Sequence, residues 1–202
     1  QTLGDYDNSG VIDIDDLSAL TSAWYNDDLS CELGPFTGSA PHLVPEFDGN
    51  FNIQDIVAFV YMWNWSSQQN AITAMEVPIY GDVDFFIEDG LLGVDMSEIE
   101  DVMSVKIQVI GEESYLQPMS LDSYFDIALS RYSQDNQVRE LNLGRFDLDE
   151  GIDRVYLYRL LSDKDQDIKI RYRFFDSDGY VVKSGSDQIN HAYSINNYHL
   201  YE

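Results

Sequence analysis

The spacing of apolar residues changes near residue 70, which divides the chain into two patterns. Before that point two segments have helical spacing, one with Leu17, Leu20 and Trp24 and another with Ile56 and Trp63. From residue 72 onward apolar and polar residues alternate, as in Val105, Ile107 and Val109. This alternation predicts strands at 75–80, 83–87, 91–96, 102–110, 124–131, 138–146, 154–161, 168–175, 180–183 and 194–201.

Many short strands without intervening helices favour an antiparallel β-sandwich. The polar stretch at 66–70 separates this part from the helical segments. We therefore predict an α+β protein of two domains, with a helical domain at 1–70 and a β-sandwich at 71–202. The sequence Asp176-Ser-Asp178-Gly179 lies between two predicted strands and is typical of a hairpin turn.

Charge is distributed very unevenly between these two parts. The formal net charge is −26, and residues 1–70 contain eleven Asp or Glu and no Lys or Arg. Such a surface repels nucleic acid and anionic membranes, so neither is an expected partner. A small region that carries only negative charge repels itself unless cations neutralise it, which favours cation binding or a basic protein partner.

A twelve-residue loop in the first part has the oxygen spacing that Ca²⁺ requires. Ca²⁺ takes six to eight oxygens, supplied in such loops from positions 1, 3, 5, 7, 9 and 12. The expected ligands are the side chains of Asp5, Asp7, Ser9, Asp13 and Asp16 together with the carbonyl of Val11. Gly10 lies at position 6, where the chain turns sharply. Only four residues precede Asp5, so the helix that usually enters such a loop is missing.

A loop followed by a helix but not preceded by one, with Asp at position 12, resembles the dockerin family. Dockerins are duplicated, and a second copy of the pattern lies around Gly49. The resemblance implies a second Ca²⁺ position with Glu46, Asp48, Asn50, Asn52 and Asp55 as ligands. Position 1 of this copy is Val44, which has no side-chain oxygen, so the loop either uses another ligand or holds no metal. The connection from 28 to 44 is also longer than a dockerin linker.

Aromatic residues of the helical part have two interpretations. Trp24, Tyr61, Trp63 and Trp65 suit either a core position at the helix contact or a surface that stacks on sugars. Their spacing matches that of the apolar residues, which favours the core.

The stretch at 91–116, with Val102–Ile110 after an acidic turn, resembles the opening of a cohesin-like sandwich. An immunoglobulin-like sandwich or a carbohydrate-binding module fits almost as well. Residues 195–202 resemble the linker that precedes a type IX secretion sorting domain, which implies a secreted, extracellular or cell-surface protein.

The expected function is that of an extracellular calcium-binding structural protein that mediates non-covalent protein–protein contacts. Its partner is a cohesin-like sandwich, from the same chain or a neighbouring subunit, and head-to-tail contacts would build a homo-polymeric fibre. The alternative is a carbohydrate-binding accessory module. No nucleophile motif or zinc-ligand spacing accompanies the three histidines, so we expect no enzyme activity. No apolar stretch is long enough for membrane insertion.

Overall fold

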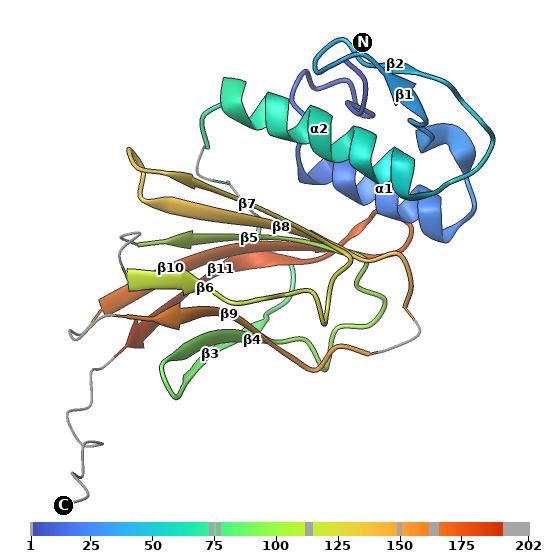
Figure 1. Ribbon diagram of the computed structural model, residues 1–202. Helices are drawn as coiled ribbons and strands as arrows, with labels where there is room; N and C mark the ends of the chain where they lie inside the picture. Colours follow the sequence, from blue (N-terminus) through green and yellow to red (C-terminus); the bar gives the residue numbers. More distant parts are fainter. Residues whose placement is uncertain are drawn as a thin grey trace, which may run out of the picture.

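A computed structural model of the chain describes residues 2–72, 75, 78–111, 115–148, 151–161 and 166–191. Two helices lie on one face of a pair of stacked sheets (Figure 1). The predicted strand at 194–201 and the secretion-linker resemblance at 195–202 lie outside the described residues. Within the described residues no helix is both long and apolar enough to cross a bilayer.

The helical part contains two loop–helix units. Helix α1 spans Ile14–Tyr25 and helix α2 spans Ile53–Gln69. Between them lie the short 3-10 helix η1 (Leu29–Cys31) and two paired strands, β1 (Phe36–Thr37) and β2 (Val44–Pro45). Both helices begin with a capping box, in which Asp13 or Asn52 is the N-cap and Asp16 or Asp55 bonds back to the cap.

The strands form two antiparallel sheets. The first has the order β11-β10-β5-β8-β7 and the second has the order β3-β4-β9-β6. The strands of the first sheet are β5 (Ser104–Ile110), β7 (Ile127–Ser133), β8 (Val138–Gly144), β10 (Gln166–Phe175) and β11 (Val181–His191). Those of the second are β3 (Asp84–Glu88), β4 (Leu91–Asp95), β6 (Leu116–Pro118) and β9 (Arg154–Leu160).

These strands confirm the predicted β-sandwich, with several differences at the level of single elements. The sequence pattern missed β6, which has only three residues, and it made β11 too short. Instead of a strand at 75–80, the described residues there show one bridge, between Tyr80 and Ser184. The predicted hairpin turn is confirmed, because Gly179 has φ +81° and donates its N–H to the carbonyl of Asp176 at 3.1 Å.

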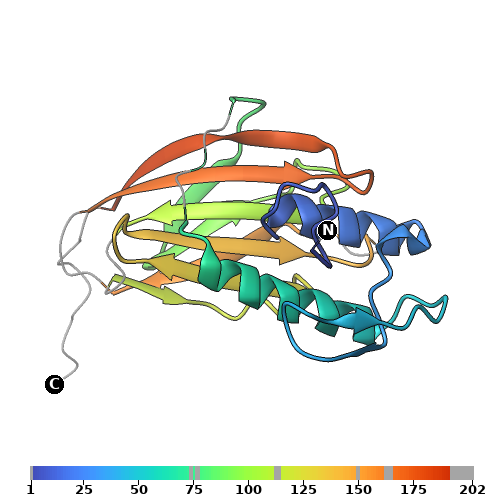
Figure 2. The ribbon, with the colours of Figure 1, turned by 90° about the horizontal axis from the view of Figure 1, so that it is seen from above.

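Alternation along β5 explains how the layers are arranged. Val105, Ile107 and Val109 point into the core between the two sheets. The alternate residues Ser104, Lys106 and Gln108 are also buried, because the helices cover the outer face of this sheet. Seen from above, α1 and α2 lie side by side across it (Figure 2).

The helical part shares a hydrophobic core with the sandwich. Ile127, Leu129 and Phe175 of the sheet belong to the same buried cluster as Leu17 and Phe59 of the helices. The ring of Trp24 stacks on that of Phe146, with centroids 4.4 Å apart. The sandwich that covers the helices is therefore the chain's own.

The aromatic residues largely follow the core interpretation. Trp63 is buried, and Trp24 and Trp65 are half-buried against the shared core. Tyr61 differs, because it lies on the outward face of α2 and is 55% exposed.

Candidate metal centre

Three carboxylates of the first loop meet at one point. Asp5, Asp7 and Asp16 each offer an oxygen, and these oxygens lie within 4.8 Å of one another. Asp5 and Asp16 are buried, whereas Asp7 is exposed, so the cluster opens to solvent on one side. Two buried carboxylates beside a third are costly unless a cation or a proton neutralises them.

Backbone N–H groups hold this loop in shape. Asp5 Oδ2 accepts from Gly10 N at 3.1 Å, and Asp16 Oδ1 accepts from Tyr6 N at 2.6 Å. Gly10 has φ +87°, a conformation that favours glycine, as expected for position 6. The loop therefore turns where the sequence predicts.

The remaining predicted ligands lie around the same turn. Ser9 donates its hydroxyl to the carbonyl of Val11 at 3.0 Å, and its N–H to Asp7 Oδ1 at 2.8 Å. Asp13 is not in the three-carboxylate cluster; its Oδ1 caps α1 by accepting from Asp15 N at 3.0 Å. This agrees with a position 9 that commonly reaches the ion through water.

Burial raises the pKa of Asp16 to about 7. Hydrogen bonds from the backbone of Asp13 and Tyr6 oppose this shift, and the charge of Asp7 adds to it. A hard divalent cation would remove the cost of ionising this carboxyl group. The set of Asp oxygens, one serine hydroxyl and one carbonyl therefore fits Ca²⁺.

The second loop has the same internal hydrogen bonds, but it uses a different residue at position 1. Glu32 Oε1 accepts from Gly49 N at 2.7 Å, as Asp5 accepts from Gly10. Asp55 Oδ1 accepts from Leu33 N and Gly34 N at 2.8 Å, as Asp16 accepts from Tyr6 and Asp7. Glu32 and Asp55 are both buried.

These equivalences revise the alignment of the second loop. Position 1 is Glu32 rather than Val44, and position 3 is Gly34 rather than Glu46. Gly34 has no room for a side chain, because a Cβ there would lie 2.8 Å from the backbone of Gln54. Residues 35–46 are an insertion between positions 3 and 4. Glu46 lies at its end, is exposed, and donates its N–H to the carbonyl of Pro35.

The other predicted residues of the second loop keep their places. Asp48 Oδ1 accepts from Asn50 N at 2.9 Å, Asn52 is the N-cap of α2, and Gly49 has φ +75°. Glu32 was missed because the spacing rule counts twelve consecutive residues, and the insertion interrupts that count. A usable signal was an acidic residue directly before Leu33, since Asp5 likewise precedes the bulky Tyr6.

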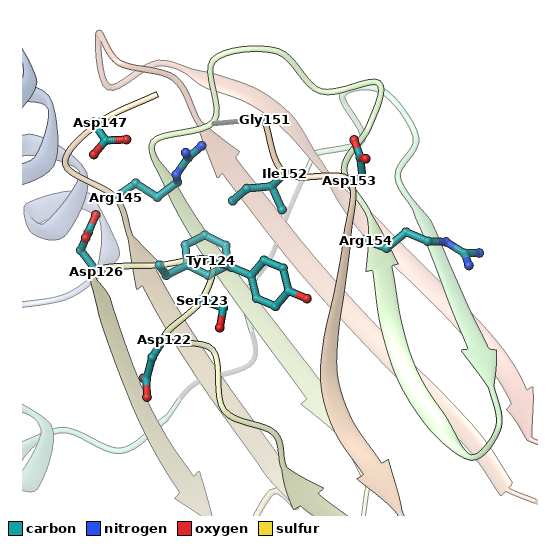
Figure 3. A pocket seen from close by; sticks show the side chains of 11 residues that line it. Asp122, Ser123, Tyr124, Asp126, Arg145, Asp147, Gly151, Ile152, Asp153 and Arg154 are labelled. Carbon is teal, nitrogen blue, oxygen red and sulfur yellow. The ribbon is translucent and has the colours of Figure 1, made fainter. Parts of the chain in front are cut away.

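A second cavity, of about 570 Å³, lies at one end of the sandwich, between the loop before β7 and the loop between β8 and β9 (Figure 3). Asp122, Tyr124 and Asp126 line it from the first loop, and Arg145 and Asp153 from the second. Asp126 Oδ2 accepts from the N–H of Phe146 at 2.8 Å. A tyrosine ring among carboxylates and guanidinium groups suits a ligand that both donates and accepts hydrogen bonds.

Comparisons with known proteins give partial similarities in structure. No family model and no curated protein matches the chain. A type II cohesin dyad from the adaptor ScaA scaffoldin of Acetivibrio cellulolyticus is 13% identical, with 55% of this chain and 44% of that chain covered and a TM-score of 0.35.

The C-terminal domain of the Streptococcus pyogenes antigen I/II-family protein AspA is 14% identical over 48% of this chain and 36% of that chain, with a TM-score of 0.23. This chain thus spans less than half the length of either structure. At these TM-scores, neither similarity carries an argument about function.

Proposed function

We propose that this chain is an extracellular, calcium-binding structural protein that mediates non-covalent protein–protein contacts at the cell surface. The observation that carries the proposal is the meeting of Asp5, Asp7 and Asp16 at the start of α1. Calcium bound there would neutralise the buried carboxylates and hold the first turn of α1, which begins at their ligand Asp16 and its neighbours.

A second Ca²⁺ is proposed in the loop around Gly49. Glu32, Asp48, Asn52 and Asp55 would supply side-chain oxygens, and Asn50 its carbonyl. The repeated hydrogen-bond pattern supports this assignment, while the missing side chain at Gly34 predicts a weaker site than the first. The expected affinity of the first loop is about 10⁻³ to 10⁻⁶ M, the range between extracellular modules and sensors.

Contacts between the helical part and the sandwich indicate what kind of surface this part recognises. The sheet face beneath α1 has an apolar centre with Leu129 and Phe175, flanked by Lys106, Arg131 and Arg173. Arg173 lies 3.4 Å from Asp15 of α1. An acidic helical part that packs on a cationic sheet face is complementary in charge.

Exchange of this packing between chains would produce the proposed fibre. If the helical part of one chain covered the sheet of the next, the contact would be head-to-tail and would not close. The segment that joins α2 to β3 would then act as the hinge.

The outer side of α2 supports a contact with a further protein. Ile53, Val57 and Tyr61 are 69%, 39% and 55% exposed and follow one another at intervals of four residues, so they form one apolar strip. The corresponding strip of α1 is Ile14, Ser18 and Ser22, and its Ser22 hydroxyl donates to the carbonyl of Ser177 in the sandwich at 2.6 Å. Exposed strips of this kind mark interaction sites.

Metal analysis combined with light scattering tests the proposal. The full chain should hold calcium after dialysis against micromolar Ca²⁺, and the double variant Asp5→Asn/Asp16→Asn should hold at least one ion fewer. Assembly at high protein concentration should depend on calcium. A chain that holds no calcium in saturating Ca²⁺ would overturn the calcium proposal, and a monodisperse monomer would overturn the fibre.

The cavity of Figure 3 favours carbohydrate binding as a second candidate function. In that case oligosaccharides should bind at Tyr124 rather than at the tryptophans, which pack in the shared core. Glycan-array binding that Tyr124→Ala abolishes would support this function, and a blank array would exclude it. No catalytic role is proposed.

A further inference from the structure

A groove of about 720 Å³ lies between the first calcium loop and the insertion at 35–46. Its volume is in the range of ligand-binding clefts. Its apolar walls are formed by Leu3, Leu29, Pro41, Leu43, Pro45 and Phe47. Three of the six belong to the insertion, and Phe47 follows it directly. The groove is therefore a feature of this chain and not of a regular twelve-residue loop.

The groove is bordered by side chains that water would not normally surround. Phe47 is 66% exposed and Leu29 is 44% exposed, although both are large and apolar. Seven of the twelve large exposed apolar residues among those described lie in residues 1–70, which form about a third of the chain. Such a concentration on a stable protein indicates that a partner covers part of this surface.

Charge determines what kind of partner fits. Asp5 and Glu32 lie at the groove, and the exposed residues Asp28 and Glu46 are adjacent in sequence to Leu29 and to Pro45 and Phe47. No Lys or Arg occurs in residues 1–70, so a cationic group meets no repulsion from this part of the chain. Calcium would neutralise Asp5 and Glu32 but would leave Asp28 and Glu46 charged.

We propose that the groove docks an arginine- or lysine-bearing segment of a partner protein. The aliphatic stem of such a side chain lies along apolar walls while its head stays at the polar rim, which is how Arg and Lys are usually half-buried. Here Phe47 and Leu29 contact the stem, and Asp28 and Glu46 receive the charged head. The prolines make the walls rigid before binding, which reduces the entropy cost.

This inference specifies the partner of the proposed function and rests on the helical part contacting another protein. It differs from the α2 strip in location and in chemistry. The strip offers an apolar helix ridge, whereas the groove selects a positive charge.

A pair of peptides tests the inference on the full, calcium-loaded chain. The probe is fluorescent acetyl-Leu-Arg-Leu-Arg-Leu-amide, and its control has citrulline in place of arginine, which keeps the shape but not the charge. We expect saturable binding of the arginine peptide, about tenfold tighter than that of the citrulline peptide, and affinity that falls with added salt. Equal binding of the two peptides, or no binding, would overturn the proposal.

Variants locate the binding site. Asp28→Asn/Glu46→Gln and Phe47→Ser should each weaken binding of the arginine peptide about tenfold. Asp28→Asn keeps a side chain that can cap η1, where Asp28 Oδ1 accepts from Ser30 N. The matched controls on the sandwich are Asp135→Asn/Glu98→Gln and Tyr180→Ser, all of which alter exposed residues. Equal losses in controls and groove variants would mean non-specific attraction and would refute the site.

The two proposals fail in different ways. Loss of calcium binding in Asp5→Asn/Asp16→Asn concerns the metal. Loss of assembly in Val57→Ser/Tyr61→Ser concerns the α2 strip. A protein that passes both of those tests yet does not distinguish arginine from citrulline refutes the groove alone.

Discussion

Glu32 Oε1 accepts the backbone N–H of Gly49 at 2.7 Å, although 17 residues separate the two. In the first loop Asp5 makes the same bond to Gly10 across only five residues. The insertion at 35–46 accounts for the difference, because it leaves the loop at position 3 and returns at position 4. The two loop–helix units are thus copies of one structure, and the second has gained a surface element.

Replacing Glu32 tests this equivalence without any metal. Glu32→Ala removes the acceptor of two backbone N–H groups, those of Asp48 and Gly49. In calcium-free buffer it should lower the free energy of unfolding by about 2 kcal/mol, the typical cost of an unsatisfied buried group. Urea denaturation measures this change.

Glu32→Gln is the matched control for that experiment. It keeps an acceptor oxygen, so its calcium-free stability should be close to that of the wild type, while its second calcium site should be weakened. If both variants keep the wild-type stability, Glu32 does not hold the loop.

The packing of α1 on the sheet depends on the absence of a side chain at Gly144. A Cβ there would lie 3.0 Å from Thr21 Cγ2 and 3.4 Å from Leu17 Cδ1. Gly144→Ala should therefore destabilise the protein by about 1 to 3 kcal/mol through overpacking. Thr21→Ser removes the methyl group but keeps the hydroxyl that bonds to Leu17 O. Thermal unfolding should show that Thr21→Ser rescues Gly144→Ala; additive losses would contradict the contact.

Glu140 lies beneath the helical part and forms a buried ionic group. Its carboxylate is 2.8 Å from Arg131 Nε and 3.4 Å from Lys106 Nζ, and its side chain is only 1% exposed. Glu140→Gln would leave two buried cations without their counter-charge, at a cost of about 3 to 5 kcal/mol. Chemical denaturation measures this loss, with the exposed Glu98→Gln as a control that should change little.

Acid should produce the same loss in the wild-type protein. Burial alone would raise the pKa of Glu140, but the charges of Lys106 and Arg131 and hydrogen bonds from Gln108 and Asn142 hold it below its ordinary value. A carboxyl group with a lowered pKa in the folded state stabilises that state above its ordinary pKa. This contribution is lost as the pH falls through the lowered pKa. The acid transition should be shallower in Glu140→Gln.

Asp16 has the opposite sign of shift in the calcium-free chain. Because burial raises its pKa to about 7, the calcium-free folded state retains a proton that the unfolded chain releases near pH 4. This stabilisation is lost as the pH rises through about 7. Calcium displaces the proton, so calcium affinity should increase up to about pH 7 and then level off.

Calorimetry at pH 6 in two buffers of different ionisation enthalpy should report proton release on binding calcium. At 100 times the dissociation constant, calcium should add about 2.7 kcal/mol to the free energy of unfolding. Asp5→Asn/Asp16→Asn should lose both effects; proton release that persists in it would place the titrating group elsewhere.

Several features of this protein follow from its sequence alone. The positions of α1 and α2, the turn at Gly10 and most strands are determined locally, because apolar periodicity, capping residues and glycine act over a few neighbouring residues. The clustering of Asp5, Asp7 and Asp16 is equally local, since all three lie within one twelve-residue loop.

Tertiary structure alone decided the rest. Glu32 enters the second loop across an insertion, and no spacing rule counts through an insertion of arbitrary length. The α1 helix covers the chain's own sheet because Gly144, Phe175 and Arg173 come together from two strands far apart in sequence. Such contacts depend on which faces meet when the layers pack, and the period of a single segment does not encode that choice.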